Sequence, residues 1–149
     1  MLKILLVEDH VDLAGMMQRQ LKRIGLSSVV ATNGPEALKK APEEMPALIL
    51  MDIVLQGEMN GFELANKLKA NAQTRSIPIL AITGRTLPRD QEMCFESGCD
   101  GYLAKPFGFQ ELQAQISKLL NRNDSESGPL KVNSRQPFGV DLPPTAVVV

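Results

Sequence analysis

The sequence is short of the residues that build zinc sites and disulfide frameworks. Its 149 residues include two cysteines and a single histidine. Cys94, Cys99 and His10 cannot by themselves supply the four ligands of a structural zinc site, and one cysteine pair does not make a disulfide framework. We interpret both thiols as reduced and structural. His10 follows two acidic residues, and we interpret it as the start of a helix, not as a metal ligand or a phosphorelay histidine.

Neither sign of charge is in excess, and no hydrophobic run is long. Lysine and arginine total 16 against 17 acidic residues, for a formal net charge of −1. This balance gives no electrostatic basis for binding nucleic acid or anionic membranes, and no basic recognition helix is visible, so we predict no direct DNA binding and no membrane partner. The first apolar run ends at Glu8 and Asp9, too early for a signal peptide or a membrane span, and we interpret the protein as cytoplasmic.

The composition is that of one folded domain followed by a tail. Hydrophobic residues make up 44% of the chain and charged residues 22%, which suits a protein with a buried core. We expect a single domain over residues 1–122. Residues 123–149 hold four of the ten prolines and show no periodic apolar pattern, so we predict a mostly disordered C-terminal tail. We also hypothesise that this tail assists docking to a partner.

Short apolar runs rich in β-branched residues recur about every 25 residues and predict strands. The five expected strands are Lys3–Val7, Ser28–Ala31, Ala47–Ile53, Ile77–Thr83 and Gly101–Ala104. Between them, apolar residues recur at spacings of three and four, which is typical of amphipathic helices. Asn33 and Asn60 stand where helices begin, and Gly25 and Gly98 where helices end. Five strands alternating with five helices predict an α/β fold, doubly wound around a five-stranded parallel sheet.

Polar side chains follow the ends of these strands. Glu8 and Asp9 come after the first strand, Asp52 lies in the third, Thr83 ends the fourth and Lys105 follows the fifth. In a doubly wound sheet these positions share one rim, where ligands bind. Three carboxylates close together suit Mg2+, and Lys105 offsets part of their charge, so a phosphoryl group could be held there. Each residue alone has a structural explanation, such as a helix N-cap, so the joint location carries the prediction.

Four segments carry a resemblance to a known family. Their sequences are KILLVED, LILMDIVL, PILAITG and GYLAKPF. On these segments the chain resembles the receiver domain of response regulators, and it is similar to the chemotaxis regulator, over residues 2 to about 122. The resemblance implies a flavodoxin-like fold and a two-component signalling switch that catalyses only its own phosphotransfer and dephosphorylation.

The resemblance also implies the residues of the site. Asp52 is the expected phosphoacceptor, and Lys105 is expected to pair with the acceptor or with a phosphoryl oxygen. Mg2+ is expected to be held by Glu8, Asp9, the Asp52 carboxylate and the backbone carbonyl of Val54. We expect no other cofactor.

The function implied by the resemblance is that of a stand-alone response regulator. Asp52 would attack the phosphohistidine of a histidine kinase, or of a histidine phosphotransfer protein, in line. Thr83 would then move to bond a phosphoryl oxygen, and Tyr102 would fill the vacated space from outside. This change would alter the face formed by the fourth helix, the fifth strand and the fifth helix, where a downstream protein would bind. A phosphorylation-dependent homodimer is a second hypothesis for the same face. The family's cis peptide bond is expected at Lys105–Pro106.

The chain departs from the common pattern of this family at a few positions. Glu8 stands where Asp is commoner, and Gln56 stands where Pro is usual, in a loop that is one residue longer than the common form. Val54 and Arg85 occupy the positions that tune how fast water reaches the phosphoryl group, and they give no acyl-phosphate lifetime.

Other functions were weighed against the receiver. A phosphatase of the haloacid dehalogenase type needs a second Asp two residues after its nucleophile, where this chain has Val54. A flavin site needs a phosphate-cradling loop after the first strand, and two acidic residues stand there instead. The alternative that stays open is a protein-binding module that keeps the receiver fold but signals without phosphate. Direct control of a target and relay to a second regulator are equally consistent with the sequence.

Overall fold

A computed structural model describes residues 1–84 and 87–124 of the chain, with side chains as far as residue 121. The strands are β1 (Lys3–Val7), β2 (Ser27–Ala31), β3 (Leu48–Asp52), β4 (Ile79–Thr83) and β5 (Gly101–Ala104). The helices are α1 (Val11–Arg23), α2 (Gly34–Glu44), α3 (Gly61–Ala70), α4 (Pro88–Glu96) and α5 (Phe109–Asp124). All five predicted strands are present in the predicted order. Arg85 and the part of the expected tail beyond Asp124 lie outside the described residues.

Two strands are shorter than the apolar runs that predicted them. The fourth strand begins at Ile79 instead of Ile77, because Pro78 has no N–H to give to a ladder and the N–H of Ile77 bonds the Thr74 carbonyl in the preceding turn. The third strand loses one residue at each end of the predicted run. At the other end of the domain, α5 continues to Asp124, two residues beyond the predicted domain boundary.

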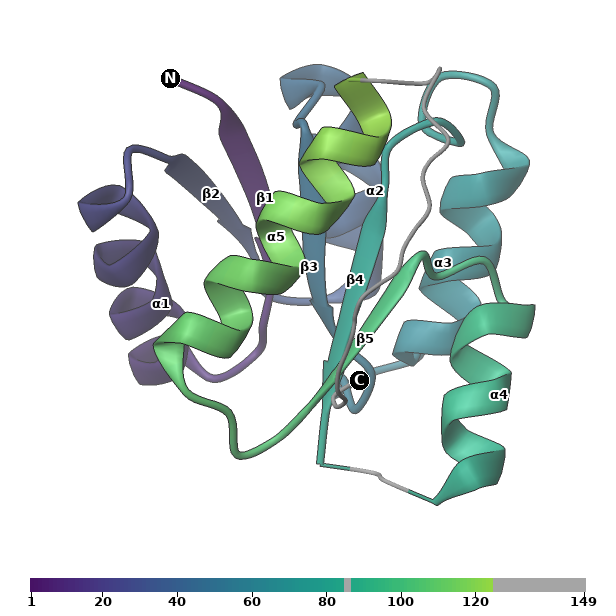
Figure 1. The fold of residues 1–149 in the computed structure, drawn as a ribbon. Helices are drawn as coiled ribbons and strands as arrows, with labels where there is room; N and C mark the ends of the chain where they lie inside the picture. Colours follow the sequence, from purple (N-terminus) through teal and green to yellow (C-terminus); the bar gives the residue numbers. More distant parts are fainter. Residues whose placement is uncertain (85–86, 125–149) are drawn as a thin grey trace.

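The sheet is parallel, with strand order β2-β1-β3-β4-β5. Helices α1 and α5 cover one face, and α2, α3 and α4 cover the other (Figure 1). This is the flavodoxin-like order, so the predicted fold class is confirmed. The order reverses between β1 and β3, and ligands of such sheets bind outside the carboxyl ends of the strands at that switch point. A ligand site is therefore expected at the residues that follow β1 and β3.

Successive side chains of each strand serve two separate cores. On β1, Ile4 and Leu6 pack with residues of α1 and α5, whereas Leu5 and Val7 pack with residues of α2 and α3. Every residue of β3 and β4 is buried. Burial on both faces explains why these strands are continuously apolar instead of alternating.

Side-chain caps fix where the helices begin. Asn33 caps α2, and Asn60 forms a reciprocal capping box with Glu63 at the start of α3, as the sequence predicts. His10 is the N-cap of α1, where its Nδ1 accepts a hydrogen bond from the N–H of Leu13 at 3.3 Å. The interpretation of His10 as the start of a helix is therefore confirmed.

The two cysteines meet at the end of α4. Gly98 adopts a φ of 109°, its N–H bonds the carbonyl of Phe95, and the N–H of Cys99 bonds the carbonyl of Cys94, both at 3.0 Å. This Schellman motif brings the side chains of Cys94 and Cys99 together in the core. A hydrogen bond with Cys94 and burial raise the pKa of the Cys99 thiol, which disfavours the reactive thiolate. Both cysteines are buried and neither is in a disulfide, in agreement with a structural role.

Candidate functional site

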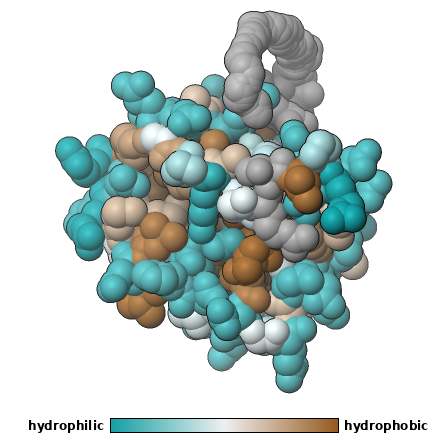
Figure 2. Space-filling view, turned by 90° about the horizontal axis from the view of Figure 1, so that it is seen from below, coloured by the Kyte–Doolittle hydropathy of each residue, from teal (hydrophilic) through white to brown (hydrophobic). Residues whose placement is uncertain are grey.

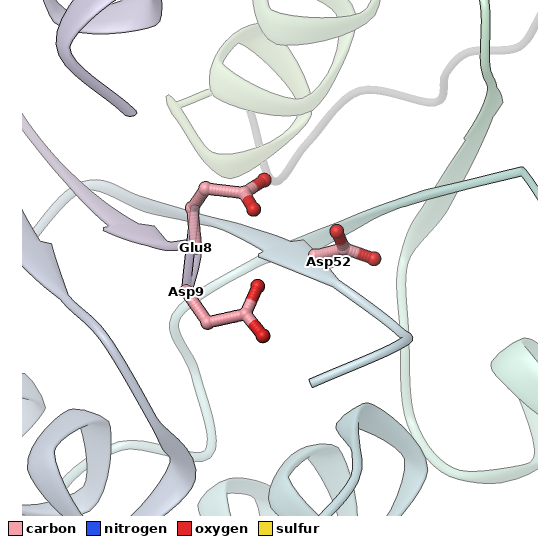
Figure 3. Close-up of side chains that lie close together, drawn as sticks. All are labelled: Glu8, Asp9 and Asp52. Atoms are coloured by element: carbon pink, nitrogen blue, oxygen red, sulfur yellow. The ribbon is translucent and has the colours of Figure 1, made fainter. Parts of the chain in front are cut away.

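Three carboxylates from two neighbouring strands converge at the switch point. Glu8 and Asp9 directly follow β1, and Asp52 is the last residue of β3. The two strands pair in parallel with Val7 opposite Met51, so both deliver their next residues to one rim. Figure 3 shows the three side chains extending into the same space, and one oxygen of each lies within 4.8 Å of the others. The predicted acidic cluster is present.

Glu8 is the most buried carboxylate of the cluster. It is 4% exposed, and its Oε2 accepts a hydrogen bond from the N–H of His10 at 3.1 Å. Burial raises the pKa of Glu8, and the charges of Asp52 and Asp9 raise it further, whereas the His10 N–H and the Lys105 ammonium lower it. A cation bound among the carboxylates would lower both the free-energy cost of burying the Glu8 charge and the repulsion between the three carboxylates.

Asp52 lies between the other carboxylates and the one nearby ammonium. Its Oδ1 accepts a hydrogen bond from the N–H of Val54 at 2.9 Å, and its Oδ2 accepts one from Lys105 Nζ at 3.0 Å. Lys105 Nζ also lies 4.0 Å from Glu8 Oε1. A cis peptide bond at Lys105–Pro106, as expected, follows this lysine. Asp52 is only 8% exposed, and a hydrogen-bond donor orients each of its two carboxylate oxygens.

The loop after β3 holds the third carboxylate from the opposite side. The N–H of Gln56 donates to Asp9 Oδ2 at 3.0 Å, which a proline at this position could not do. Gly57 follows with a φ of 104°, a conformation that favours glycine. The loop closes where the N–H of Gly61 bonds the carbonyl of Ile53 at 2.9 Å. The residue that departs from the common family pattern thus contributes a contact to the site through its backbone.

The two expected switch residues lie on one face of adjacent strands. Thr83 is fully buried at the end of β4, and Tyr102 on β5 stands opposite Ala81, so both side chains project toward α4. Tyr102 is 8% exposed and packs in the same core as Cys94. Burial raises the pKa of its phenol. Tyr102 thus already lies in this core, and the expected switch role of Thr83 and Tyr102 stays a prediction.

The donor set of the cluster fits a hard divalent cation. Three carboxylates and one ammonium leave an excess of negative charge, and oxygen ligands are those that Mg2+ prefers. The Val54 side chain is 54% exposed, so this residue reaches the site only through its backbone. Sequence patterns did not reveal the N–H groups of His10, Val54 and Gln56 that hold the carboxylates, because backbone donors leave no trace in residue type.

Comparison with known families decides the identity of this fold and site. The family model of the response regulator receiver domain matches residues 4–117. The chain belongs to the response regulator receiver domain family. The receiver domain of the sensor histidine kinase PA1611 from Pseudomonas aeruginosa, whose structure holds a magnesium ion in the active-site cleft, is 31% identical with a TM-score of 0.74; the match covers 80% of this chain and 98% of that one. The acidic cluster of this chain thus lies in the same kind of domain as the one that binds Mg2+ in the PA1611 structure.

Curated relatives of this receiver are longer than the chain. The DNA-binding response regulator MtrA of Mycobacterium leprae is 36% identical over 141 residues, which cover 95% of this chain and 60% of the relative. The alkaline phosphatase synthesis transcriptional regulatory protein PhoP of Bacillus subtilis is 35% identical over 122 residues, which cover 82% of this chain and 50% of the relative. The chain thus spans 50% to 60% of the length of these two relatives.

The prediction of no direct DNA binding was wrong. It rested on charge balance and on the lack of a basic helix within these 149 residues. Relatives that match this receiver are named as DNA-binding or transcriptional regulators, and a large share of each lies outside the match. Charge counted over a receiver domain carries no information about the rest of a longer regulator. Separately, among the residues described, no helix has the length and apolarity to cross a membrane.

Proposed function

We propose that this receiver accepts a phosphoryl group on Asp52, with Mg2+, from the phosphohistidine of a histidine kinase. The observation that supports this most directly is the position of Asp52, which is bonded at 3.0 Å by Lys105 and grouped with Glu8 and Asp9 within 4.8 Å. An acceptor needs a charged oxygen, a counter-cation and a metal beside it, and all three requirements meet at this residue.

The cation would be held by Glu8, Asp9 and Asp52, with the backbone carbonyl of Val54 as a further ligand. When bound, Mg2+ would neutralise charge that develops on the phosphoryl oxygens. The contacts of Asp9 and Glu8 to backbone N–H groups each engage one oxygen, so the other oxygen of each carboxylate is available as a ligand. This arrangement presents the carboxylates to a metal without a change in the backbone.

The transfer itself is carried by residues of this chain. A lone pair on an Asp52 carboxylate oxygen forms the new O–P bond while the P–N bond of the donor histidine breaks, and the imidazole leaves with that electron pair and takes up a proton. Lys105 then moves its charge from the carboxylate to the phosphoryl oxygens. Water later attacks phosphorus to regenerate the Asp52 carboxylate and release inorganic phosphate. The protein changes no other substrate.

The proposed switch couples this chemistry to the α4-β5-α5 face. Thr83 ends β4 beside the acceptor strand, and its hydroxyl can bond a phosphoryl oxygen after a local shift. Tyr102 shares a core with the end of α4, so a shift of Thr83 changes the space around Tyr102 and the position of α4. We further propose that the output is regulation of DNA binding, because relatives that match this receiver are named DNA-binding regulators. The expectation of a stand-alone regulator stays a prediction.

The phosphoacceptor is tested by intact mass after incubation with acetyl phosphate and Mg2+. We expect a gain of about 80 Da, the mass of one phosphoryl group, in the wild type. The gain should be lost in Asp52→Asn and in EDTA, and kept in the control Asp12→Asn, an exposed acidic residue on α1. If no gain occurs, and beryllofluoride with Mg2+ leaves the Tyr102 resonance unchanged, the phosphate-independent binding module replaces this proposal.

The DNA output is tested by crosslinking the native protein to DNA in its own cells and sequencing the captured fragments. Recovery of specific fragments from wild type, reduced in Asp52→Asn at equal protein level, is the expected result. Equal recovery from both would separate the DNA contact from phosphorylation, and no recovery from either would remove the proposed output.

A further inference from the structure

Each carboxylate of the acidic cluster has one oxygen that accepts a hydrogen bond from a main-chain N–H group. The three bonds run from His10 to Glu8 Oε2 at 3.1 Å, from Gln56 to Asp9 Oδ2 at 3.0 Å, and from Val54 to Asp52 Oδ1 at 2.9 Å. Such bonds fix the orientation of a carboxylate before a metal binds. One oxygen of each carboxylate lies within 4.8 Å of the others, and Figure 3 shows all three side chains extending into that space. The cluster therefore keeps one oxygen per carboxylate for a main-chain partner and presents the other to a cation.

The presentation of one oxygen per carboxylate distinguishes between divalent cations. Ca2+ takes about six to eight oxygen ligands and readily accepts both oxygens of one carboxylate, whereas Mg2+ is smaller, requires a regular octahedron and keeps several water ligands. The other oxygen of Asp52 bonds the ammonium of Lys105, which further disfavours binding through both oxygens there. Figure 2 views the end of the sheet at which the strands finish, and hydrophilic surface covers much of it, so water has access to this rim. The arrangement therefore favours Mg2+ over Ca2+.

The hydrogen bond from Gln56 differs from the other two because it joins two loops. The other two bonds each connect residues two positions apart, so they are local to one strand end. Gln56 and Asp9 are 47 positions apart, so their bond depends on the shape of the loop after β3. In that loop Gly57 adopts a φ of 104°, a conformation that favours glycine, directly after the donor residue. The orientation of Asp9 is thus set by a loop that follows a different strand.

Given the metal site of the proposed function, on which this inference rests, we propose that the N–H of Gln56 sets the selectivity of that site for Mg2+ over Ca2+. Gln56 is a positioning residue that acts through Asp9. Its N–H holds Asp9 Oδ2, which keeps this carboxylate from giving both oxygens to a larger cation. Gln56 is exposed, and its side chain is not part of the contact. Proline, the usual residue at this position in the family, has no N–H to donate, so the contact is particular to this form of the loop.

The proposal is tested by titrating the full chain with Mg2+ alone and with Ca2+ alone, in the absence of a phosphodonor, and following the backbone amide resonances. Gln56→Pro removes the donor and should weaken Mg2+ binding about tenfold, because Asp9 loses the group that orients it. Ca2+ binding should change by less than about twofold, because the released carboxylate can offer both oxygens to the larger cation. The conservative variant Gln56→Ala keeps the N–H and should retain the selectivity of the wild type.

A second pair of variants changes the shape of the loop and leaves Gln56 in place. Gly57 has a φ of 104° and Gly25 a φ of 86°, and nothing lies within 4 Å of a Cβ added at either position. Gly57→Ala strains the loop that directs the Gln56 N–H, so it should lower the ratio of the Ca2+ to the Mg2+ dissociation constant. Gly25→Ala imposes the same kind of strain beyond the far end of α1 and should leave that ratio unchanged.

Three outcomes would overturn the proposal. If Gln56→Pro binds both cations as the wild type does, the N–H does not position Asp9. If Gln56→Pro and Gln56→Ala lose selectivity alike, the side chain and not the N–H sets it. If Gly25→Ala changes the ratio as much as Gly57→Ala, the effect comes from general stability. A wild type that binds neither cation overturns the metal site of the proposed function as well, whereas a wild type that gains the phosphoryl group while Gln56→Pro keeps its selectivity overturns this proposal alone.

Discussion

Replacement of Glu8 by Gln is predicted to stabilise the metal-free protein. Glu8 is buried and charged, and the Asp9 and Asp52 carboxylates have oxygens within 4.8 Å of it. Gln keeps the shape and keeps an oxygen that can accept the His10 N–H, so the substitution removes charge with little other change. Residues that serve ligand binding often reduce the stability of the fold, so replacing one of them can stabilise the protein.

The magnitude follows from the distances. At an effective dielectric constant near 20, the Lys105 ammonium at 4.0 Å attracts Glu8 by about 4 kcal/mol. Each of the two carboxylates at up to 4.8 Å repels it by about 3.5 kcal/mol on the same scale. Repulsion exceeds attraction by about 3 kcal/mol, and access of water to the partly exposed Asp9 carboxylate weakens its repulsion, which reduces this difference by about half. We therefore expect Glu8→Gln to raise the free energy of unfolding by about 1 to 2 kcal/mol.

The assay is urea unfolding at pH 7 and low ionic strength, first in EDTA and then in excess Mg2+. Glu43→Gln, an exposed position on α2, is the matched control and should change stability by less than about 0.5 kcal/mol. Mg2+ should stabilise the wild type more than Glu8→Gln, because the variant has lost a ligand charge. The reasoning is refuted if Glu8→Gln is less stable than wild type in EDTA, or if Mg2+ stabilises both proteins equally.

Four further predictions concern the pH dependence of Glu8, the Lys105 ion pair and two glycines. The pKa of Glu8 is raised in the folded metal-free protein, so protonated Glu8 stabilises the fold at low pH and this stabilisation is lost as the pH rises through the folded-state pKa. The free energy of unfolding, measured by urea unfolding over a series of pH values, should therefore fall as the pH rises through that range. The fall should be smaller in Glu8→Gln, which has no carboxyl group to titrate at this position. Lys105→Met leaves the buried Asp52 carboxylate without its ammonium and should cost about 2 kcal/mol in EDTA by urea unfolding; an unchanged midpoint would mean that the 3.0 Å contact carries no net stability. Gly25→Ala should cost about 1 kcal/mol, because its φ is 86° and nothing lies near an added Cβ. Gly98→Ala should cost more, about 2 kcal/mol, since its φ is 109° and the added Cβ would lie 2.6 Å from a side-chain carbon of Lys69 on α3. Thermal unfolding of both variants separates the cost of backbone strain alone, at Gly25, from the cost of strain plus a steric clash, at Gly98. Equal costs for the two variants would show that the clash with Lys69 adds nothing.

Much of the fold was readable from local chemistry. Asn33 and Asn60 cap helices because a side-chain oxygen after an extended residue satisfies the first helical N–H groups, and that requirement is visible in the residue type. The two fully buried strands were recognisable because a parallel sheet covered on both faces needs apolar residues at every position. The limits of β4 were missed at Ile77, where a turn and a proline prevent pairing inside an apolar run.

The candidate site was also predicted only in part from the sequence. The residue types at the strand ends predicted carboxylates and a lysine at one rim, because parallel strands deliver their carboxyl ends to one edge. The side of the sheet that Tyr102 faces is not visible in residue type, since side-chain direction on an edge strand depends on its register with β4. The prediction of no direct DNA binding was wrong because the charge balance of a receiver domain does not report on the function of the DNA-binding regulators that it resembles.

The sequence by itself determined the five strands and helices, the caps and the set of charged residues, because each depends on neighbours within a few positions along the chain. Only the tertiary structure decided that β1 lies beside β3, that Lys105 bonds Asp52, and that the Gln56 N–H holds Asp9. Those contacts join residues 53 and 47 positions apart, and their formation depends on the packing of both sheet faces at once. Long-range geometry of this kind is a property of the assembled core, which no local pattern encodes.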